Sequence, residues 1–572
     1  MSGVEITPSN RSSRSRSRSR TRNSTANTRS TSATRRPSSS STRKSLSSSS
    51  LNKLTITSTQ INNETIIPSV NVILDNSLPA EFFKQDIIAL TKTLKISKWY
   101  KKQLDLKILK VNRISGALTN SIYKVEYNDP KNEIYLPSLL LRVYGKNVDE
   151  LIDRDHELLT LIKLSQKRIG PRLLGIFING RFEQFLDGFV TLNKEQIRDS
   201  IISQMFGRRM KDLHYKIQLD EEDLKSVPTC WRLIEKWLKI FEFEYLPNYI
   251  SSGINPEDIF FMKFDELKNL IFKYKNWLFL KYDEKNFTSN YKFCHNDTQY
   301  GNLLLCESFK PEDIIVDSPP TTKVDDIIIK STSNKKDNNL VVIDFEYSGP
   351  NFPAFDIVNH FSEWMTNYHD PIKSYYLDES KYPTRLEQLN LLKSYIEYDF
   401  QLPSSNLKTS KNPVEFLIGE SGNNHEDTLN LIQYEIEKMY NECIYWRGSV
   451  QIFWCFWGLI QNGPIKPKLQ KSESEKGIDS TYNITIDVEK LNINGKENDD
   501  HSKDDDDDSD IVLEEAITSS DDDFDYLKYS NQKISLFLGD AIQFNLIKIE
   551  EILPKYRDFI KYLNTDLLNS SL

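Results

Sequence analysis

The stretch that decides the fold is FCHNDTQYGNLLL at residues 293–305. It places His295 and Asp297 two residues apart, sets Asn302 five residues after the Asp, and ends in an apolar run typical of a buried strand. A second stretch, LVVIDFE at residues 340–346, is a predicted strand of branched aliphatic residues with Asp344 at its end. The two stretches together supply the polar residues of one candidate site.

Phosphoryl transfer requires a carboxylate that accepts the hydroxyl proton, oxygen ligands for Mg²⁺, and cations over the phosphates. Asp297 suits the first role, and Asn302 and Asp344 suit the second. Glu346 is either a further metal contact or a simple surface acid. The same order of groups occurs in protein kinases as H-R-D-x₄-N followed by D-F-G. We expect His295 to brace its loop through backbone hydrogen bonds and not to carry a proton.

The regions on either side predict the fold class. Beyond Asn193 the apolar periodicity is helical, whereas the region before it is rich in strands. We therefore expect an α+β, protein-kinase-like bilobal fold with a small β-rich N-terminal lobe and a larger, mostly helical C-terminal lobe. The elements predicted before Asn193 are helices over 78–99 and 148–164 and strands over 106–114, 121–127, 136–143, 173–178 and 181–185.

The small lobe is expected to hold the nucleotide. Arg142 ends an apolar strand and would point a fixed cation at the phosphates, with Glu157 on the next helix as its ion-pair partner. The alternative is a surface ion pair worth at most about 1 kcal/mol. The turn RISGALTN at 113–120 is either a phosphate contact or a plain hairpin. The remaining candidate nucleotide contacts are Ser115, Gly116, Thr119 and Asn120 in that turn, and Gln184 and Leu186, where backbone amides would meet adenine.

Composition limits how much of the 572-residue chain can fold. Residues 1–50 are almost entirely Ser, Arg, Thr and Asn, and residues 463–523 are mostly charged or polar, so neither can bury enough apolar surface to offset its chain entropy. We expect a disordered tail over 1–71, a nucleotide-binding lobe over 72–186, and a catalytic lobe over 187–572. Polar inserts are expected at 307–338 and 463–523 within the last of these.

The net charge of -8 conceals two opposite segments. Residues 1–50 carry ten Arg and one Lys against one Glu, whereas residues 499–525 carry fourteen acidic residues against one Lys. The charge left for the remainder is that of an ordinary soluble surface, so no nucleic-acid partner is expected for the folded part. The basic head is a regulatory tail or an RNA- or phospholipid-binding tail. Its sequence around Ser38 suits an upstream protein kinase, which is one candidate partner.

The five cysteines are odd in number and show no metal-ligand spacing, which fits buried thiols in a reducing compartment. The N-terminus lacks an apolar signal segment, and no run of uncharged apolar residues is long enough to span a bilayer. A cytoplasmic protein without a transmembrane segment is therefore expected.

Seven motifs give the sequence a family resemblance. It resembles the choline/ethanolamine kinases, cytosolic enzymes that use ATP and Mg²⁺ to phosphorylate the hydroxyl of an amino alcohol, and its long head and inserts look similar to those of fungal members. The resemblance covers roughly 76–462 and resumes at 524–572. The motifs are LKISKWY (94–100), ISGALTN (114–120), LLLRVYG (139–145), GRFEQFL (180–186), FCHNDTQYGNLL (293–304), VVIDFEYSG (341–349) and FDIVNHFSEW (355–364).

The resemblance implies roles for individual positions. Asp297 matches the base of the family, Asp344 its metal-binding carboxylate, and Asn302 and Glu346 neighbouring metal contacts, while Gln299 matches a nucleotide contact. A quaternary ammonium has no N–H donors and is best held by aromatic faces beside an anion. Trp454 and Trp457, three apart on a predicted helix, either pack in the core or form such a site. The residues that match the amino-alcohol site of the family are Glu363, Tyr368, Trp454, Trp457 and, beyond an insert, Tyr529.

The expected activity is that of a choline kinase, which makes phosphocholine for the CDP-choline route to phosphatidylcholine, with secondary activity on ethanolamine. Two alternatives stay open. One is an ethanolamine kinase, and the other is an inactive kinase-fold scaffold with an RNA- or membrane-binding tail, against which the intact Asp297, Asn302 and Asp344 argue. Family members commonly form dimers, so a homodimer is a further candidate assembly.

Overall fold

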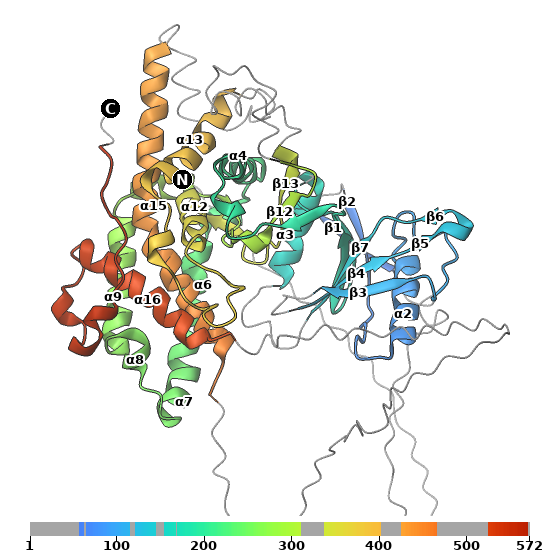
Figure 1. Ribbon diagram of the computed structural model, residues 1–572, viewed down its shortest axis with the longest axis horizontal. Coiled ribbons are helices and arrows are strands. Elements are labelled where there is room, and N and C mark those ends of the chain that lie inside the picture. The colour runs from blue at the N-terminus through green and yellow to red at the C-terminus, as the bar shows by residue number, and fades with distance from the viewer. Residues whose placement is uncertain are drawn as a thin grey trace, which may run out of the picture. The chain divides into compact units, whose positions relative to one another are not determined.

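A seven-stranded sheet forms the first part of the computed structural model, which describes residues 56–61, 65–114, 120–144, 154–167, 169–310, 337–401, 425–465 and 524–569 (Figure 1). The strand order is β1-β2-β8-β9-β7-β4-β3. Neighbouring strands are antiparallel except for β2 and β8, which run parallel. The strands are β1 (Ile56–Ile61), β2 (Thr65–Val70), β3 (Lys110–Ile114), β4 (Asn120–Glu126), β7 (Leu139–Tyr144), β8 (Leu173–Phe177) and β9 (Gly180–Gln184).

Strands β1 and β2 correct the expected boundary of the N-terminal tail. We expected the tail to extend to residue 71, but the structure pairs β2 with β8 and buries Ile67 and Val70. The physical reason is local: β-branched Ile, Val and Thr residues recur through 56–70 and favour strands, although Ser- and Asn-rich sequence surrounds them. Residues 1–55 lie outside the part of the chain that the structure describes.

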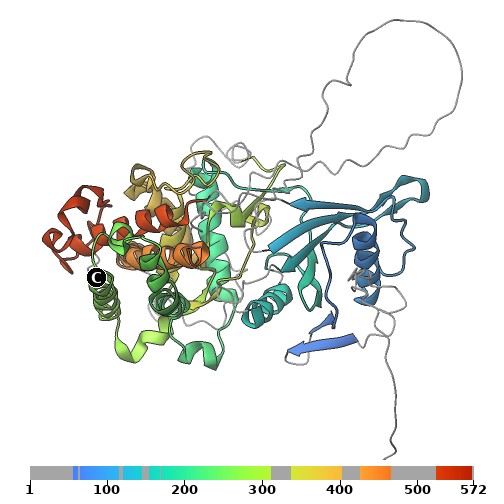
Figure 2. The ribbon, with the colours of Figure 1, turned by 90° about the horizontal axis from the view of Figure 1, so that it is seen from below.

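One face of the sheet is covered by helix α2 (Ala80–Thr93), which contributes Phe83, Ile87 and Leu90 to a shared apolar core (Figure 2). Leu139, Leu141 and Val143 of β7 and Phe182 of β9 belong to the same core. Because side chains alternate along a strand, the residues between them point to the opposite face. These residues include Arg142, Arg181 and Glu183.

The second part of the structure is mostly helical. A long helix, α15, packs against α16 in this part of the structure (Figure 1). Among the described helices, none combines the length and the apolar character needed to cross a bilayer. The helices are α3 (Arg154–Lys167), which follows β7 in the chain, and then α4 (Ser200–Lys216), α5 (Glu221–Lys225), α6 (Thr229–Ile240), α7 (Leu246–Ser251), α8 (Pro256–Phe260), α9 (Phe264–Phe279), α12 (Pro353–Glu363), α13 (Arg385–Gln401), α15 (His425–Asn462) and α16 (Tyr526–Gln543).

Two small sheets lie among these helices and position the candidate site. One has the order β10-β12-β13 and the other pairs β11 with β14. All of their pairings are antiparallel. The strands are β10 (Phe189–Thr191), β11 (Lys292–Cys294), β12 (Leu303–Cys306), β13 (Leu340–Val342) and β14 (Gly349–Asn351), and a separate short pair is formed by β5 (Asn128–Asp129) and β6 (Ile134–Tyr135).

The α+β class expected from the sequence is confirmed, and the helix and strand types are those predicted. The ends of the elements differ by a few residues. The helix expected over 78–99 ends at Thr93, because the chain turns there and both Lys95 and Lys98 take a positive φ. The strand expected over 106–114 begins only at Lys110.

A buried ion pair holds α16 against α15. Arg447 of α15 donates from Nε to Asp540 Oδ2 at 2.9 Å and from Nη1 to the carbonyl oxygen of Asn564 at 3.0 Å. Both charged side chains are almost completely buried. Removing one partner of such a pair leaves an uncompensated charge in a region of low dielectric.

We therefore expect Arg447→Met to lower the free energy of unfolding of the full chain by about 3–5 kcal/mol. Urea unfolding followed by tryptophan fluorescence measures this change. The matched control is Lys225→Met, which removes an exposed ion pair with Glu221 and should change the free energy by less than about 0.5 kcal/mol. Equal effects of the two substitutions would contradict a structural role for the buried pair.

Candidate active site

The antiparallel pair of strands β12 and β13, called the β12–β13 hairpin below although residues 307–339 separate the two strands in the sequence, brings Asn302 and Asp344 together. In the pairing of β12 with β13, Leu303 lies opposite Val342, and the Ile343 N–H donates to the carbonyl oxygen of Asn302 at 3.0 Å. Asn302 immediately precedes β12 and Asp344 follows β13, so the two side chains emerge at the same end of the hairpin. Asp344 has a φ of 65°, a strained backbone conformation for a residue other than glycine that is typical of functional sites.

Asp297 lies against this hairpin. The Asn302 side-chain amide donates to Asp297 Oδ2 at 2.8 Å and to its backbone oxygen at 2.9 Å. Asp297 is only 7% exposed, and this burial raises its pKa well above the usual range, with further upward contributions from the charges of Glu363 and Asp344. Three carboxylates therefore influence one another at this point.

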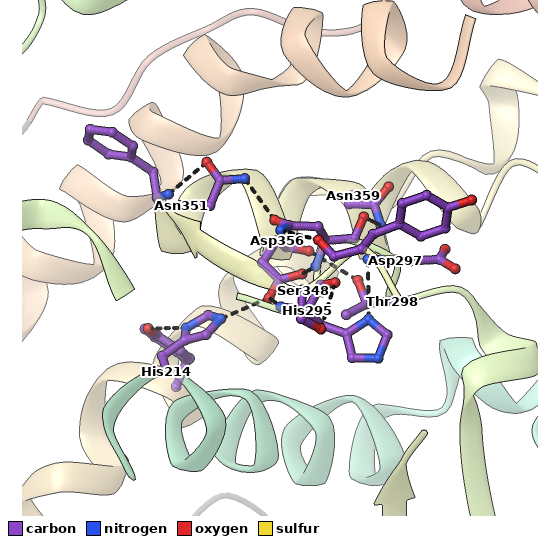
Figure 3. A network of polar contacts seen from close by, with 12 residues as sticks. His214, His295, Asp297, Thr298, Ser348, Asn351, Asp356 and Asn359 are labelled. Atoms are coloured by element: carbon purple, nitrogen blue, oxygen red, sulfur yellow. Dashed lines mark hydrogen bonds and ion pairs between the residues drawn. The ribbon is translucent and has the colours of Figure 1, made fainter. Parts of the chain in front are cut away.

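The loop that carries Asp297 is held by Asp356 of α12 (Figure 3). Its Oδ2 accepts from the backbone N–H of His295 at 2.6 Å and its Oδ1 from the N–H of Asn296 at 2.9 Å. His214 of α4 reaches the same carboxylate through Nε2 at 3.0 Å. A single buried carboxylate thus satisfies two consecutive loop amides, which would be costly to leave without partners.

The two histidines of this network are structural. His295 Nε2 lies 2.8 Å from the carbonyl oxygen of Ile343, and its Nδ1 accepts from the Asp297 N–H at 3.2 Å. His214 Nδ1 lies 2.8 Å from the hydroxyl of Tyr395. Burial lowers the pKa of both imidazoles, which favours the neutral ring. The prediction that His295 braces its loop through backbone contacts is confirmed.

Further amide contacts fix the remainder of the loop. Asn296, which has a φ of 67°, donates from Nδ2 to the carbonyl oxygen of Tyr347 at 2.9 Å and accepts from Asn351 Nδ2 at 2.7 Å. Thr298 donates to the carbonyl oxygen of Asp356 at 3.1 Å, and its own carbonyl lies 3.0 Å from His360 Nδ1. All six residues come from this loop, β14 and its flanks, or α12, so contacts within the protein fix the conformation of the loop.

The cluster of His214, Cys294 and Asp356 has the residue types of a metal site, since its potential ligand atoms lie within 4.8 Å of one another. The hydrogen bonds of these residues show that they support the loop instead of binding a metal. Both ring nitrogens of His214 already have partners, and both oxygens of Asp356 accept from the loop. Burial raises the pKa of the Cys294 thiol well above its usual range, so the thiolate that a metal requires is disfavoured. The cluster is part of the loop support.

A chain of alternating charges leads from α3 to Asp344. Glu157 contacts Arg181 Nη2 at 2.8 Å, and Arg181 Nε contacts Glu183 Oε1 at 2.5 Å. Glu183 lies 4.0 Å from Arg142 Nε, and Arg142 Nη1 donates to Asp344 at 3.3 Å. The expected pair of Arg142 with Glu157 is therefore wrong. Arg181, opposite Arg142 on the neighbouring strand and facing the same way, takes the carboxylate of Glu157 instead.

The other nucleotide predictions are only partly covered by the described residues. Ser115, Gly116 and Thr119 lie outside them, and Asn120 is described only as the first residue of β4. Gln184 ends β9 and accepts from Arg172 Nε at 3.1 Å, and the half-buried Leu186 follows two residues later. Half-buried Gln299 precedes the turn Tyr300–Asn302, where its carbonyl accepts from the Asn302 N–H at 3.1 Å.

Four aromatic residues gather near Asp297, whose charge acts on Tyr529. We call Tyr368, Trp454, Trp457 and Tyr529 the aromatic cluster. The rings of Trp454 and Trp457 meet edge to face at 5.3 Å, and Trp457 and Tyr529 do so at 6.2 Å. The Tyr368 hydroxyl donates to Glu363 Oε2 at 2.7 Å, which joins the predicted anion to the cluster.

Neighbouring polar groups orient the two indoles. Trp454 Nε1 donates to Asn359 Oδ1 at 2.7 Å, and Trp457 Nε1 donates to the Tyr347 hydroxyl at 2.8 Å. Both indole N–H groups are therefore satisfied away from the ring faces. The structure thus assembles all five residues that the resemblance assigned to the amino-alcohol site, including Tyr529, which follows the longer insert.

Several residues of the site were missed by sequence reasoning. Asp356, Asn359 and His360 fall within a quoted motif, and the signal that could have found them is the presence of polar side chains in an otherwise apolar helix. His214 and Lys533 have no comparable signal. Each lies in a helix far from Asp297 in the sequence, and only the packing of α4 and α16 brings them to the site.

The choline/ethanolamine kinase family model matches residues 111–538, and the choline kinase N-terminus model matches residues 58–107. The chain is 35% identical to a choline kinase of Saccharomyces cerevisiae, with 88% of this chain and 82% of that protein covered. It is 30% identical to an ethanolamine kinase of the same yeast, with 84% and 80% covered. A choline kinase of Schizosaccharomyces pombe is 31% identical, with 81% and 90% covered.

A solved structure supports the fold alone. The choline kinase of Cryptosporidium parvum superposes with a TM-score of 0.50 at 17% identity, and the match covers 81% of this chain and 98% of that one. The protein-kinase-like arrangement expected from the sequence is thereby confirmed. Because the family model spans most of the chain and the alignments cover at least 80% of each yeast relative, the chain belongs to the choline/ethanolamine kinase family.

Proposed function

We propose that the protein phosphorylates choline with ATP, giving phosphocholine and ADP, and that it acts on ethanolamine as a secondary substrate. The observation that carries this proposal is that buried Asp297 lies close to two different groups of residues. One group is Asn302 and Asp344, whose oxygens suit a nucleotide-bound cation. The other group is the aromatic cluster with Glu363, which suits an organic cation.

In this proposal Asp297 is the base. The hydroxyl of the amino alcohol loses its proton to the Asp297 carboxylate while its oxygen forms a bond to the γ-phosphorus and the bond to the ADP oxygen breaks. A carboxylate with a raised pKa is a stronger base than an exposed Asp, which suits proton abstraction near neutral pH. The hydrogen bond from Asn302 leaves the other oxygen of Asp297 to meet the substrate.

The residues beside Asp297 fit a magnesium ion. Mg²⁺ prefers oxygen ligands from carboxylates and amides. Asp344 is 27% exposed, and the amide nitrogen of Asn302 is committed to Asp297, so its oxygen faces away from that contact. Glu346 is half-buried close to Asp344, whose charge adds to burial in raising the pKa of Glu346. These three residues would hold the ion, which when bound would neutralise charge on the phosphates.

Nucleotide contacts follow from the charge chain and the strand ends. Among the described residues Arg142 is the cation that pairs with Asp344, so it would contact the phosphates. Glu157 supports it indirectly through Arg181 and Glu183. We assign Gln184, Leu186 and Gln299 to the nucleotide as well, together with Ser115, Gly116, Thr119 and Asn120.

The choice of choline over ethanolamine rests on the chemistry of the aromatic cluster. A quaternary ammonium needs ring faces and a nearby anion, whereas a primary ammonium needs three hydrogen-bond acceptors. The indole N–H groups are donors and are already used, and the Tyr368 hydroxyl donates to Glu363. The inactive-scaffold alternative is disfavoured because Asp297, Asn302 and Asp344 are present and adjacent. The cytoplasmic location, the homodimer and the upstream kinase stay predictions.

The direct test is ATP turnover by the full chain with choline, with ethanolamine and with buffer alone. We expect turnover with both amino alcohols and a larger kcat/KM for choline. A larger kcat/KM for ethanolamine would overturn the assigned preference, and turnover equal to that in buffer would overturn the kinase proposal.

Asp297→Ala should lower kcat for choline by about 10²- to 10⁴-fold, the usual contribution of a positioned base. Nucleotide binding, followed by fluorescence titration with ADP, should be nearly unchanged because Asp297 faces the acceptor hydroxyl. Turnover at close to the wild-type rate would show that another group accepts the proton.

Trp457→Leu should raise KM for choline by roughly 3- to 30-fold through loss of one cation–π contact. KM for ATP should stay within twofold of wild type. The matched control is Trp277→Leu in α9, a half-buried tryptophan whose ring stacks on Phe544 at 4.6 Å, outside the cluster. A control that raises KM for choline as much as Trp457→Leu does would argue against aromatic binding of the substrate.

A further inference from the structure

A buried lysine lies next to the aromatic cluster. Lys533 of α16 is 0% exposed, and its ammonium makes no hydrogen bond to any described residue. The nearest carboxylate oxygen is Glu363 Oε1 at 3.9 Å, and the ammonium lies 5.1 Å from the centre of the Tyr529 ring. Tyr529 and Lys533 are four residues apart on one helix and therefore share a face.

Burying the charge of Lys533 costs free energy of folding. A buried ammonium loses its hydration, and a charge pair in a protein interior recovers that loss only with good geometry and further hydrogen bonds. A distance of 3.9 Å is too long for a hydrogen bond, so the interaction with Glu363 is one of charge alone. A methionine or leucine would fill the same space without this cost, so the charge itself is the feature to be explained.

Glu363 is the group that benefits from this charge. It is 2% exposed, and its Oε2 accepts from the Tyr368 hydroxyl. Burial raises the pKa of Glu363, while the charge of Lys533 and then the hydrogen bond from Tyr368 act in the opposite direction. Without Lys533 the buried acid would be protonated over a wider range of pH, and a neutral acid cannot attract a cation.

The other groups around this pair do not replace Lys533. Burial keeps the Cys455 thiol neutral by raising its pKa, and it does the same for Tyr529 and Tyr368. Asp297 is an anion or a neutral acid, never a cation. The titratable groups that face the pair are Asp297 and Tyr300 from the loop after β11, Tyr368 after α12, Cys455 from α15 and Tyr529 from α16.

We propose that Lys533 is a positioning residue for substrate binding, which holds Glu363 as a carboxylate so that the aromatic cluster can accept a quaternary ammonium at neutral pH. The inference rests on the proposed function, because it assigns the cationic end of the substrate to this cluster. Lys533 lies on the α16 side of Glu363 and leaves Oε1 free of a hydrogen bond, so the carboxylate acts on the substrate through its charge. That mode of attraction suits a cation without N–H donors.

The test is the pH dependence of choline binding in Lys533→Met. At pH 7 we expect KM for choline to rise roughly tenfold, because Glu363, a carboxylate in the wild-type protein, would be about nine-tenths protonated in the variant. Because a raised carboxyl pKa removes the anion at low pH and restores it at high pH, the increase in KM should shrink toward pH 9. Lys533→Arg should retain most of the affinity for choline, and KM for ATP should be unchanged in both variants.

The matched control is Lys528→Met, which removes an exposed lysine from the same helix and should leave KM for choline within twofold at every pH. The inference is overturned if Lys533→Met has the wild-type KM for choline across the pH range. It is also overturned if KM for ATP rises equally or if Lys533→Arg is as impaired as Lys533→Met, since both results indicate a purely structural role.

A second measurement does not depend on turnover. Urea unfolding of Glu363→Gln, Lys533→Met and the double variant gives a cycle of stabilities. Glu363→Gln leaves Lys533 buried and uncompensated, so the double variant should be more stable than that single variant, and this comparison holds even if Lys533→Met fails to fold. The inference would be overturned if the loss of unfolding free energy in the double variant equalled the sum of the losses in the two single variants. Absence of choline turnover by the wild-type protein would overturn the proposed function, and with it the inference, whereas additive losses in an active enzyme overturn the inference alone.

Discussion

The carboxylate of Asp356 is the constraint on which the site depends. Its two oxygens accept from the consecutive backbone amides of His295 and Asn296, and the His214 ring lies within hydrogen-bond distance of the same carboxylate. These contacts hold Asn296 in a left-handed conformation that costs energy when unsupported. The left-handed Asn296 directs the next residue, Asp297, toward Asn302 at the end of the β12–β13 hairpin. The loop geometry is therefore set by the protein and not by the ligands.

Charge balance is the second theme of the structure. The charges alternate in sign from α3 to the hairpin through Glu157, Arg181, Glu183, Arg142 and Asp344. Glu363, whose charge also acts on Asp297, lies beside Lys533. Carboxylates buried without cations would take up protons. The cations nearby let the site keep several negative groups close together, as the proposed binding of a metal-bound nucleotide and a cationic alcohol requires.

The elements that sequence predicted well are those whose signal is local. The hairpin with Asn302 and Asp344 could be found because strand patterning and spacing within two short stretches place both residues. The partner of Arg142 could not, because strand register across β7 and β9 decided that Arg181 intervenes. Strands β1 and β2 were hidden by their polar surroundings, although their β-branched residues carried a weak signal.

The sequence by itself determined the α+β class through its periodicity and indicated the family through its motifs. It predicted Asp297, Asn302 and Asp344 as site residues from their spacing along the chain. Tertiary structure alone decided which distant helices meet at that site. Asp356 with His214, and Glu363 with Lys533, come from segments separated by more than a hundred residues. Their pairing depends on how α4, α12 and α16 pack, and burial in that packing converts ordinary polar residues into strongly interacting charges.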